Sequence, residues 1–438
     1  MLDKKDASAR SKTTSYKVVL PFYAYAALSF LMATILLFFS SENFLNHYFQ
    51  PHIIAITHIM TLGWATMIIL GASYQFLPVM IESELYSDTL AYSTFILSAI
   101  GIPLLAYGFY FFNMGFYTKL GGCLIILSLL SYLINLGFSI TKSAKENIHA
   151  VYIFTAALWL VLTASIGLTL VYNFTDIILP NNSLHYLPLH VNFGIIGWFI
   201  LLVIGVASRL IPMFLISKYT NNTLLKVIYY LINASILTYF FVFQYALPQE
   251  WTLIPLFILL TGILLFTYFC YKSYKGRIRK SVDAQMKLSL FSITIISIPI
   301  LLISTIILTF RYVAEEQNAF FLSYGFIIIF GWITALILGM TFTTLPFIIW
   351  TPEYFSRSHL PSTPNPKDLF NSLLFKIMSV IYLIGLILFV FGIFTKSIIL
   401  LKIGSIFLLV CALLYTLNVI IILKHTAPPL VKSGNGNL

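Results

Sequence analysis

Residues 63–78 read GWATMIILGASYQFLP, and the same spaced pattern returns at 197–212 and 331–346. In each copy, a Gly-Trp pair is followed by a glycine seven residues after the tryptophan and by a proline seven residues later. Trp64, Trp198 and Trp332 are separated by 134 residues in both intervals. A repeat of this regularity indicates three copies of one structural unit. We place the units at about 18–148, 149–287 and 288–424.

The amino-acid composition indicates an integral membrane protein that forms a single membrane domain over 1–438. Hydrophobic residues make up 60% of the chain, aromatic residues 16% and charged residues only 9%, and the mean hydropathy is +0.95. Such a chain cannot present an ordinary polar surface to water. A spanning helix needs about 20 apolar residues, and four stretches in each unit meet this requirement. The twelve stretches begin near Leu20, His52, Leu90, Leu120, Val151, Leu187, Leu224, Leu253, Leu288, Ala319, Leu369 and Ile398.

The basic residues predict the orientation of these spans. Lysine and arginine are retained on the cytoplasmic side of short loops, and here they gather before span one and after spans four, six and eight. We therefore expect a multi-pass protein of a bacterial cytoplasmic (inner) membrane, with cytoplasmic tails at 1–17 and 425–438. The net charge of +11 fits topology signals and contacts with anionic membrane lipid, so no nucleic-acid partner is expected.

The tryptophan, glycine and proline of each copy recur every seven residues. On a helix this spacing drifts by only about 20° per step, so the three residues lie on one stripe. The glycine allows close helix approach, as small residues do in membranes, and the proline is tolerated where neighbours bond the freed carbonyl. We expect the stripe to be a packing seam and the tryptophans to be structural.

Four spans per unit is an even number, so the three units share one orientation. This predicts twelve transmembrane helices in three four-helix arcs with pseudo-threefold symmetry, because inverted-repeat transporters have odd-numbered units. The architecture resembles subunit I of the haem–copper oxidases, such as cytochrome c oxidase, over nearly the whole chain. More loosely, it resembles the NnrS-type haem and copper membrane proteins linked to nitric oxide stress. In the oxidase superfamily, the second helix of each arc carries most of the metal and haem ligands.

Two histidines lie in these second helices. His58 is six residues before Trp64, and His190 is eight residues before Trp198. At about 100° per residue, the two side chains project roughly 160° apart in the common frame. We therefore expect them to enter different pores between the arcs. By the resemblance, His58 corresponds to a ligand of the low-spin haem and His190 to a ligand of the active-site copper.

Each candidate ligand also has a structural interpretation. His58 could be a hydrogen-bonded packing residue, and His190 could belong to a polar cluster that satisfies free donors at a helix N-terminus. His52 is a second cofactor-binding candidate that also fits a solvated interfacial residue. Tyr324, eight residues before Trp332, could ligate haem iron or anchor its helix at the membrane interface.

Other positions depart from the oxidase pattern. The tenth span, 319–350, contains no histidine, and the seventh, 224–245, lacks the adjacent histidine pair that the family uses for copper. One imidazole where the family has three disfavours a copper centre. We also expect no carboxylate inside a span, whereas proton pumps usually bury Asp or Glu as relays. The resemblance therefore implies haem b as the cofactor, without a full oxygen-reducing centre.

Three polar residues share one position in the repeat. Gln75, Arg209 and Thr343 each lie eleven residues after the tryptophan of their unit. A polar residue in all three copies predicts a polar ring at the cytoplasmic mouth of the bundle. For Arg209, the alternative is a side chain that extends along the helix to the membrane surface.

These features together predict a haem-binding membrane protein that takes part in respiration, in electron transfer or in the response to nitric oxide stress. Other respiratory subunits and a cytochrome or quinol donor are the candidate protein and redox partners. The first alternative is a cofactor-free channel, transporter or scaffold on the same fold. The second is a functional terminal oxidase, in which case the chain is an oxidoreductase that acts on cytochrome c or quinol.

Overall fold

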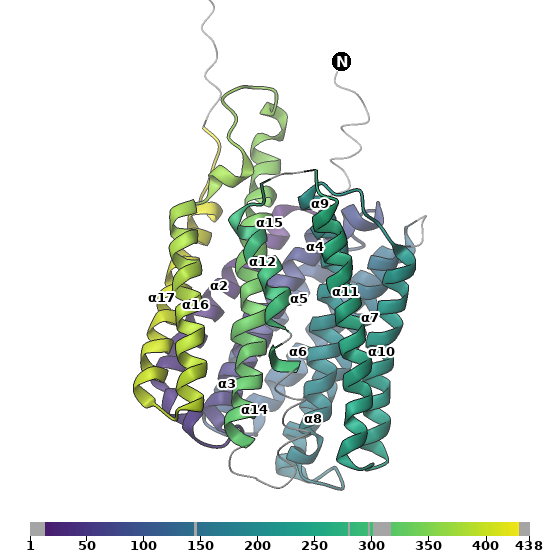
Figure 1. The fold of residues 1–438 in the computed structure, drawn as a ribbon, viewed down its shortest axis with the longest axis vertical. Helices are drawn as coiled ribbons and strands as arrows, with labels where there is room; N and C mark the ends of the chain where they lie inside the picture. The colour runs from purple at the N-terminus through teal and green to yellow at the C-terminus, as the bar shows by residue number, and fades with distance from the viewer. Residues whose placement is uncertain (1–13, 144–146, 279–280, 297, 301–316, 429–438) are drawn as a thin grey trace, which may run out of the picture.

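The computed structural model describes residues 14–143, 147–278, 281–296, 298–300 and 317–428. Most of the two expected tails, 1–13 and 429–438, and part of the ninth expected span, 301–316, lie outside these residues. Within the described ranges the chain is a bundle of roughly parallel and antiparallel helices (Figure 1). Eleven of these helices are long and apolar enough to cross a membrane. The protein is therefore an all-helical protein of multi-pass membrane type.

Each unit has the same order of helices: a first helix, a second composite helix, and a pair of helices joined by a short turn. The first unit consists of α2 (Tyr16–Phe39), α3 (Pro51–His58), η2 (Ile59–Thr66), α4 (Met67–Ile81), α5 (Asp88–Tyr110) and α6 (Phe116–Thr141). The second consists of α7 (Ile148–Asp176), α8 (Ser183–Asn192), η3 (Phe193–Ile200), α9 (Leu201–Leu215), α10 (Asn222–Gln244) and α11 (Leu253–Lys275). The third has α12 (Ala284–Ile295), α14 (Gln317–Phe326), η5 (Ile327–Ile333), α15 (Thr334–Tyr354), α16 (Ser372–Phe394) and α17 (Ile398–Leu423).

The middle of each composite helix is a π-helix. The segments η2, η3 and η5 all begin five residues before the tryptophan of their unit. A π-turn accommodates more residues than an α-turn, and its hydrogen bonds reach back five residues. Accordingly, the backbone N–H of Met67 donates to the carbonyl of Leu62. The repeated sequence therefore adopts the same uncommon backbone three times.

The glycine after each tryptophan lies against the first helix of its own unit. A Cβ added at Gly71 would be 2.7 Å from Cβ of Phe22 in α2. The same atom at Gly205 would collide with Tyr152 in α7, and at Gly339 it would be 2.5 Å from the carbonyl oxygen of Gln285 in α12. Real Cβ atoms do not approach this closely. The predicted role of these glycines in close helix packing is confirmed.

The three units contact one another. Helix α6 packs against α7, and α17 packs against α2, which are the last and the first helices of the described residues. The composite helices are joined by two buried hydrogen bonds: Trp64 Nε1 donates to Thr334 Oγ1 at 3.3 Å, and Trp198 Nε1 donates to Thr66 Oγ1 at 3.1 Å. Each threonine lies two residues after the tryptophan of its own unit. The predicted seam thus also links neighbouring units.

Replacing Thr66 with valine should destabilise this link. Valine has nearly the shape of threonine but offers no acceptor to Trp198, whose side chain is fully buried. A buried donor without a partner costs about 1–3 kcal/mol, so we expect a lower melting temperature in detergent. Thr61→Val is the matched control, because Thr61 donates only to Thr57 of its own helix. Equal melting temperatures for the two variants would contradict a stabilising role for the bond.

Candidate functional site

His58 and His190 lie beside each other. Their ring centroids are 6.3 Å apart, and the ring planes differ by only 24°. The expectation that they enter different pores is therefore wrong. Equivalent helices of neighbouring units do not present the same face to each other. Residues at different positions of the repeated helix can therefore lie side by side. The two histidines form one site between the first and second units.

Backbone carbonyls fix the tautomer of both imidazoles. His58 Nδ1 lies 2.8 Å from the carbonyl oxygen of Ile54, and His190 Nδ1 lies 3.0 Å from that of Thr163. A carbonyl oxygen only accepts, so each Nδ1 carries the proton and donates it. The lone pair of each neutral ring is then on Nε2, which has no hydrogen-bond partner among the described residues. Both rings are thus prepared as electron-pair donors.

Neighbouring helices hold the two rings in place. The ring of Phe109, on α5, lies 4.6 Å from the His58 ring. Gly167, on α7, makes room for His190, because a Cβ at this position would be 2.8 Å from Cε1 of the imidazole. The carbonyl of Thr163, one turn earlier on α7, bonds the same ring. Helix α7 therefore contacts His190 of α8 through both Thr163 and Gly167.

The pair fits a metal that needs only two ligands from the protein. Ligand histidines usually donate their other ring N–H to a carbonyl or carboxylate, as both rings do here. In the part of the chain that the structure describes, no three or more His, Cys, Asp or Glu side chains are placed so that they could hold a metal ion together. A bare zinc or copper ion usually takes three or four protein ligands. A haem iron is held largely by its porphyrin, so two histidines from the protein would be sufficient to bind it.

The distance between the two rings can be compared with the distance that a shared metal would require. An imidazole nitrogen binds a first-row metal at about 2 Å, and a metal between two facing Nε2 atoms therefore separates the ring centroids by roughly 6 Å. The observed separation is 6.3 Å. Two neutral nitrogen donors from different units therefore lie at a separation that one shared metal ion would span.

The other two cofactor-binding candidates lie elsewhere. His52 packs edge-on against Tyr110, with ring centroids 4.4 Å apart, and its Nδ1 is buried without a partner. Tyr324 lines a cavity between the second and third units, together with Asn192 of α8. Neither His58 nor His190 is among the described residues that line this cavity. The structure thus joins His58 with His190, while Tyr324 belongs to a separate site.

The three residues of the predicted polar ring differ in their surroundings. Arg209 is exposed, whereas Gln75 and Thr343 are half-buried. Thr343 Oγ1 donates to Gly339 of its own helix at 3.0 Å, and Oε1 of Gln75 is buried without a partner. No hydrogen bond joins the three side chains within the described ranges. The ring remains a prediction from the repeat.

Sequence reasoning missed the residues that support the histidine pair. Gly167 was detectable only as a lone glycine inside an apolar span, a feature that often marks close helix contact. Its contact with His190 depends on how α7 and α8 pack, which no local pattern encodes. The carbonyls of Ile54 and Thr163 carry no side-chain signal at all, because every residue has such a group.

Comparison with known proteins does not add a relative. No protein-family model matches the sequence, and no curated protein matches it.

Proposed function

We propose that this chain is a membrane electron-transfer protein on a scaffold like that of haem–copper oxidase subunit I, and that it binds one b-type haem through His58 and His190. The observation that carries this proposal is the pair of neighbouring imidazoles, with ring centroids 6.3 Å apart, each bound through Nδ1 to a backbone carbonyl. His190, for which the resemblance implies copper, would here be the second histidine that holds the haem.

The arrangement of the units supports the scaffold. Contacts join α6 to α7 and α17 to α2, and residues of the second and third units line one cavity. Each unit therefore touches both others, as three arcs around a pseudo-threefold axis would. Together with the three equivalent π-segments, these contacts favour the twelve-helix arrangement that the repeat predicts.

The residues of the site have distinct roles in the proposal. His58 and His190 supply two neutral nitrogen donors, and the carbonyls of Ile54 and Thr163 hold the donors in one tautomer and make them more basic. Phe109 and Gly167 fix the ring positions. A haem iron bound in this way supplies reversible one-electron transfer. With two histidine donors from the protein, the group would serve electron transfer rather than the binding of a gas.

Localisation and partners follow from the same proposal. The concentration of lysine and arginine at one end of the spans favours a bacterial cytoplasmic membrane with both termini in the cytoplasm. An electron-transfer protein needs a donor, and a cytochrome or a quinol in contact with other respiratory subunits would meet this need. Copper is not part of the proposed centre, because the site offers two imidazoles and no third ligand among the described residues.

The test is an absorption spectrum of the full chain purified in detergent, combined with iron and haem analysis. We expect a Soret band, a change on reduction and about one haem per chain. His58→Ala and His190→Ala should each abolish or strongly reduce the haem content. His185→Ala is the matched control, since His185 is an exposed residue of α8, and it should keep the spectrum.

Two results would contradict the proposal. A wild-type protein without haem or iron would exclude the haem centre, and bound copper or zinc without haem would identify a bare-ion site instead. Retention of full haem content in both histidine variants would show that the pair is not the ligand set. His52→Ala should also retain the haem, because His52 lies against Tyr110 and not beside His190.

The runner-up is a cofactor-free channel, transporter or scaffold. The observation in its favour is the cavity beside Tyr324, which is lined by neutral residues where the oxidase resemblance would place a metal ligand. Absence of haem from the purified wild type would favour this second function. Oxygen consumption with a cytochrome c or quinol donor would instead favour a terminal oxidase.

A further inference from the structure

The cavity between the second and third units lies where a repeated hydrogen bond is interrupted. In the first two units the tryptophan N–H bonds a threonine of another unit: Trp64 with Thr334, and Trp198 with Thr66. By the same rule, Trp332 would bond residue 200, but this residue is isoleucine. Within the described residues no acceptor is found for Trp332 Nε1. Trp332 and Ile200 both line the cavity, which therefore lies where the third link is missing.

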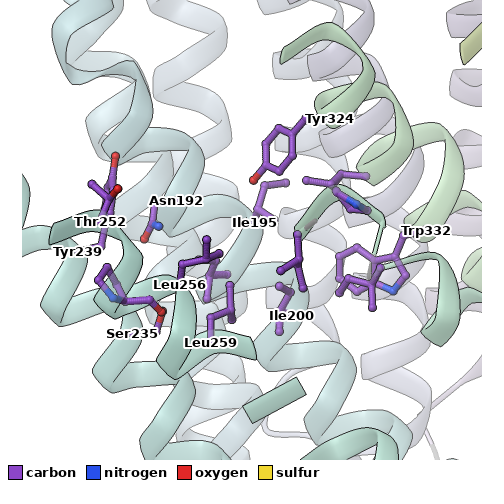
Figure 2. Close-up of a pocket in the computed structure, with 16 residues that line it drawn as sticks. Asn192, Ile195, Ile200, Ser235, Tyr239, Thr252, Leu256, Leu259, Tyr324 and Trp332 are labelled. Carbon is purple, nitrogen blue, oxygen red and sulfur yellow. The ribbon is translucent and has the colours of Figure 1, made fainter. Parts of the chain in front are cut away.

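Most of the cavity wall is apolar and none of its described residues is charged. Its volume is about 120 Å³. Isoleucine and leucine side chains from η3, α11 and η5 form much of the surface (Figure 2). The described lining favours a neutral occupant, since a charge beside these residues would lose its hydration without gaining a partner.

Several polar groups of the cavity have no hydrogen-bond partner among the described residues. Asn192 Oδ1 is buried without a hydrogen bond. The hydroxyls of Tyr239 and Tyr324 also have none among the described residues. Figure 2 shows the Tyr324 hydroxyl directed from α14 toward the side of Asn192 and Ile195. By contrast, Ser235 donates to the carbonyl of Pro255 at 2.8 Å and is satisfied.

An unpartnered buried carbonyl oxygen requires an explanation. Leaving one unsatisfied costs about 1–3 kcal/mol, and native proteins usually fill such a place with a ligand or ordered water. The oxygen of Asn192 calls for a hydrogen-bond donor, and the two phenol hydroxyls can donate to or accept from the same occupant.

The size of the cavity narrows the class of ligand. An apolar cavity of about 150 Å³ binds benzene, so about 120 Å³ is close to the space that one six-membered ring needs. We propose that this cavity binds a neutral hydroxylated aromatic ring, whose hydroxyl donates to Asn192 Oδ1 while its ring packs against Ile195, Ile200 and Leu256. The ring could come from a free phenol or from the head of a membrane quinol. The inference does not depend on haem binding.

The experiment compares two ligands that differ only in the hydroxyl. Full-length protein in detergent is titrated with 4-fluorophenol or fluorobenzene, and binding is followed by ¹⁹F NMR. We expect saturable binding of 4-fluorophenol, at least about tenfold tighter than that of fluorobenzene, which matches roughly 1.4 kcal/mol for the hydrogen bond. Asn192→Leu keeps the side-chain size but removes the acceptor, and should abolish this preference while fluorobenzene still binds.

Controls separate the proposal from non-specific binding to detergent. Asn222→Leu, at an exposed position at the start of α10, should leave both affinities unchanged. If Asn192→Leu does not fold, Tyr324→Phe supplies the second test. This variant should weaken the binding of 4-fluorophenol and leave the binding of fluorobenzene unchanged. Absence of saturable binding to the wild type, or equal weakening of both ligands by Asn192→Leu, would overturn the proposal and leave ordered water as the occupant.

A competition experiment identifies the source of the ring. Decyl-hydroquinone carries the same hydroxylated ring on an apolar tail. If it displaces 4-fluorophenol at lower concentration than hydroquinone does, the site takes the head of a membrane quinol. If hydroquinone competes and the decyl compound does not, the site takes a free phenol. Failure of both to compete would contradict a hydroxylated-ring site.

Discussion

Replacing Gly339 with alanine should prevent stable packing of the third unit. The added Cβ would lie 2.5 Å from the carbonyl oxygen of Gln285 and would also collide with Ser289. Backbone atoms cannot rotate away, so α12 and α15 must separate. Overpacking of this kind costs about 1–3 kcal/mol of stability and occasionally more. Because the clash is with a backbone atom, we expect a cost at the upper end of this range. We expect little folded protein in size-exclusion chromatography and a strongly reduced melting temperature.

Gly325→Ala is the matched control for this variant. Gly325 lies in the composite helix of the same unit, and no atom lies within 4 Å of a Cβ added there. Alanine is favoured over glycine in a helix by about 1 kcal/mol, so the control should be as stable as the wild type or more so. Similar behaviour of the two variants would show that α12 does not contact Gly339 as described.

Replacing Trp64 with alanine should have an effect of similar size. Its ring is fully buried, stacks on Phe30 with centroids 4.5 Å apart, and meets Tyr415 edge-on at 4.9 Å. The indole N–H also donates to Thr334. Removal of a buried tryptophan side chain costs about 3–5 kcal/mol. Because Tyr415 belongs to α17, the variant should loosen the contact between the first and third units.

The melting temperature of purified variants in detergent measures this effect. Trp251→Ala provides the control, because half of the Trp251 side chain is exposed (50%), and its loss should shift the melting temperature far less. Trp64→Phe should lie between the two, since it keeps the stacking and loses the hydrogen bond. Equal melting temperatures for the two alanine variants would contradict a structural role for the repeated tryptophan.

The sequence was sufficient to predict the class of fold and the seam. The spacing of Trp64, Gly71 and Pro78 repeats three times, and composition alone requires a membrane, so helices and close glycine contacts follow from local chemistry. The π-segments could not be foreseen in the same way. A segment of eight mostly apolar residues is compatible with an α-helix or a π-helix, so its sequence alone does not distinguish the two.

The candidate site was predictable only in part. His58 and His190 stand out because imidazoles inside apolar spans are rare. Their proximity depends on how neighbouring units turn toward each other, and the angle between two positions on superposed helices does not contain this information. The sequence does contain a feature that marks the cavity. Thr66 and Thr334 each lie two residues after the tryptophan of their unit, whereas the second unit has Ile200 at this position.

The contact between α17 and α2 has a consequence for the order of the chain. Because the third unit touches the first, the packing of the described helices does not depend on which unit comes first along the chain. A circular permutant that begins at α7 and ends at α6, with the original termini joined by a flexible linker, would keep every interhelical contact described above. Linker length, and not helix packing, would then limit its folding.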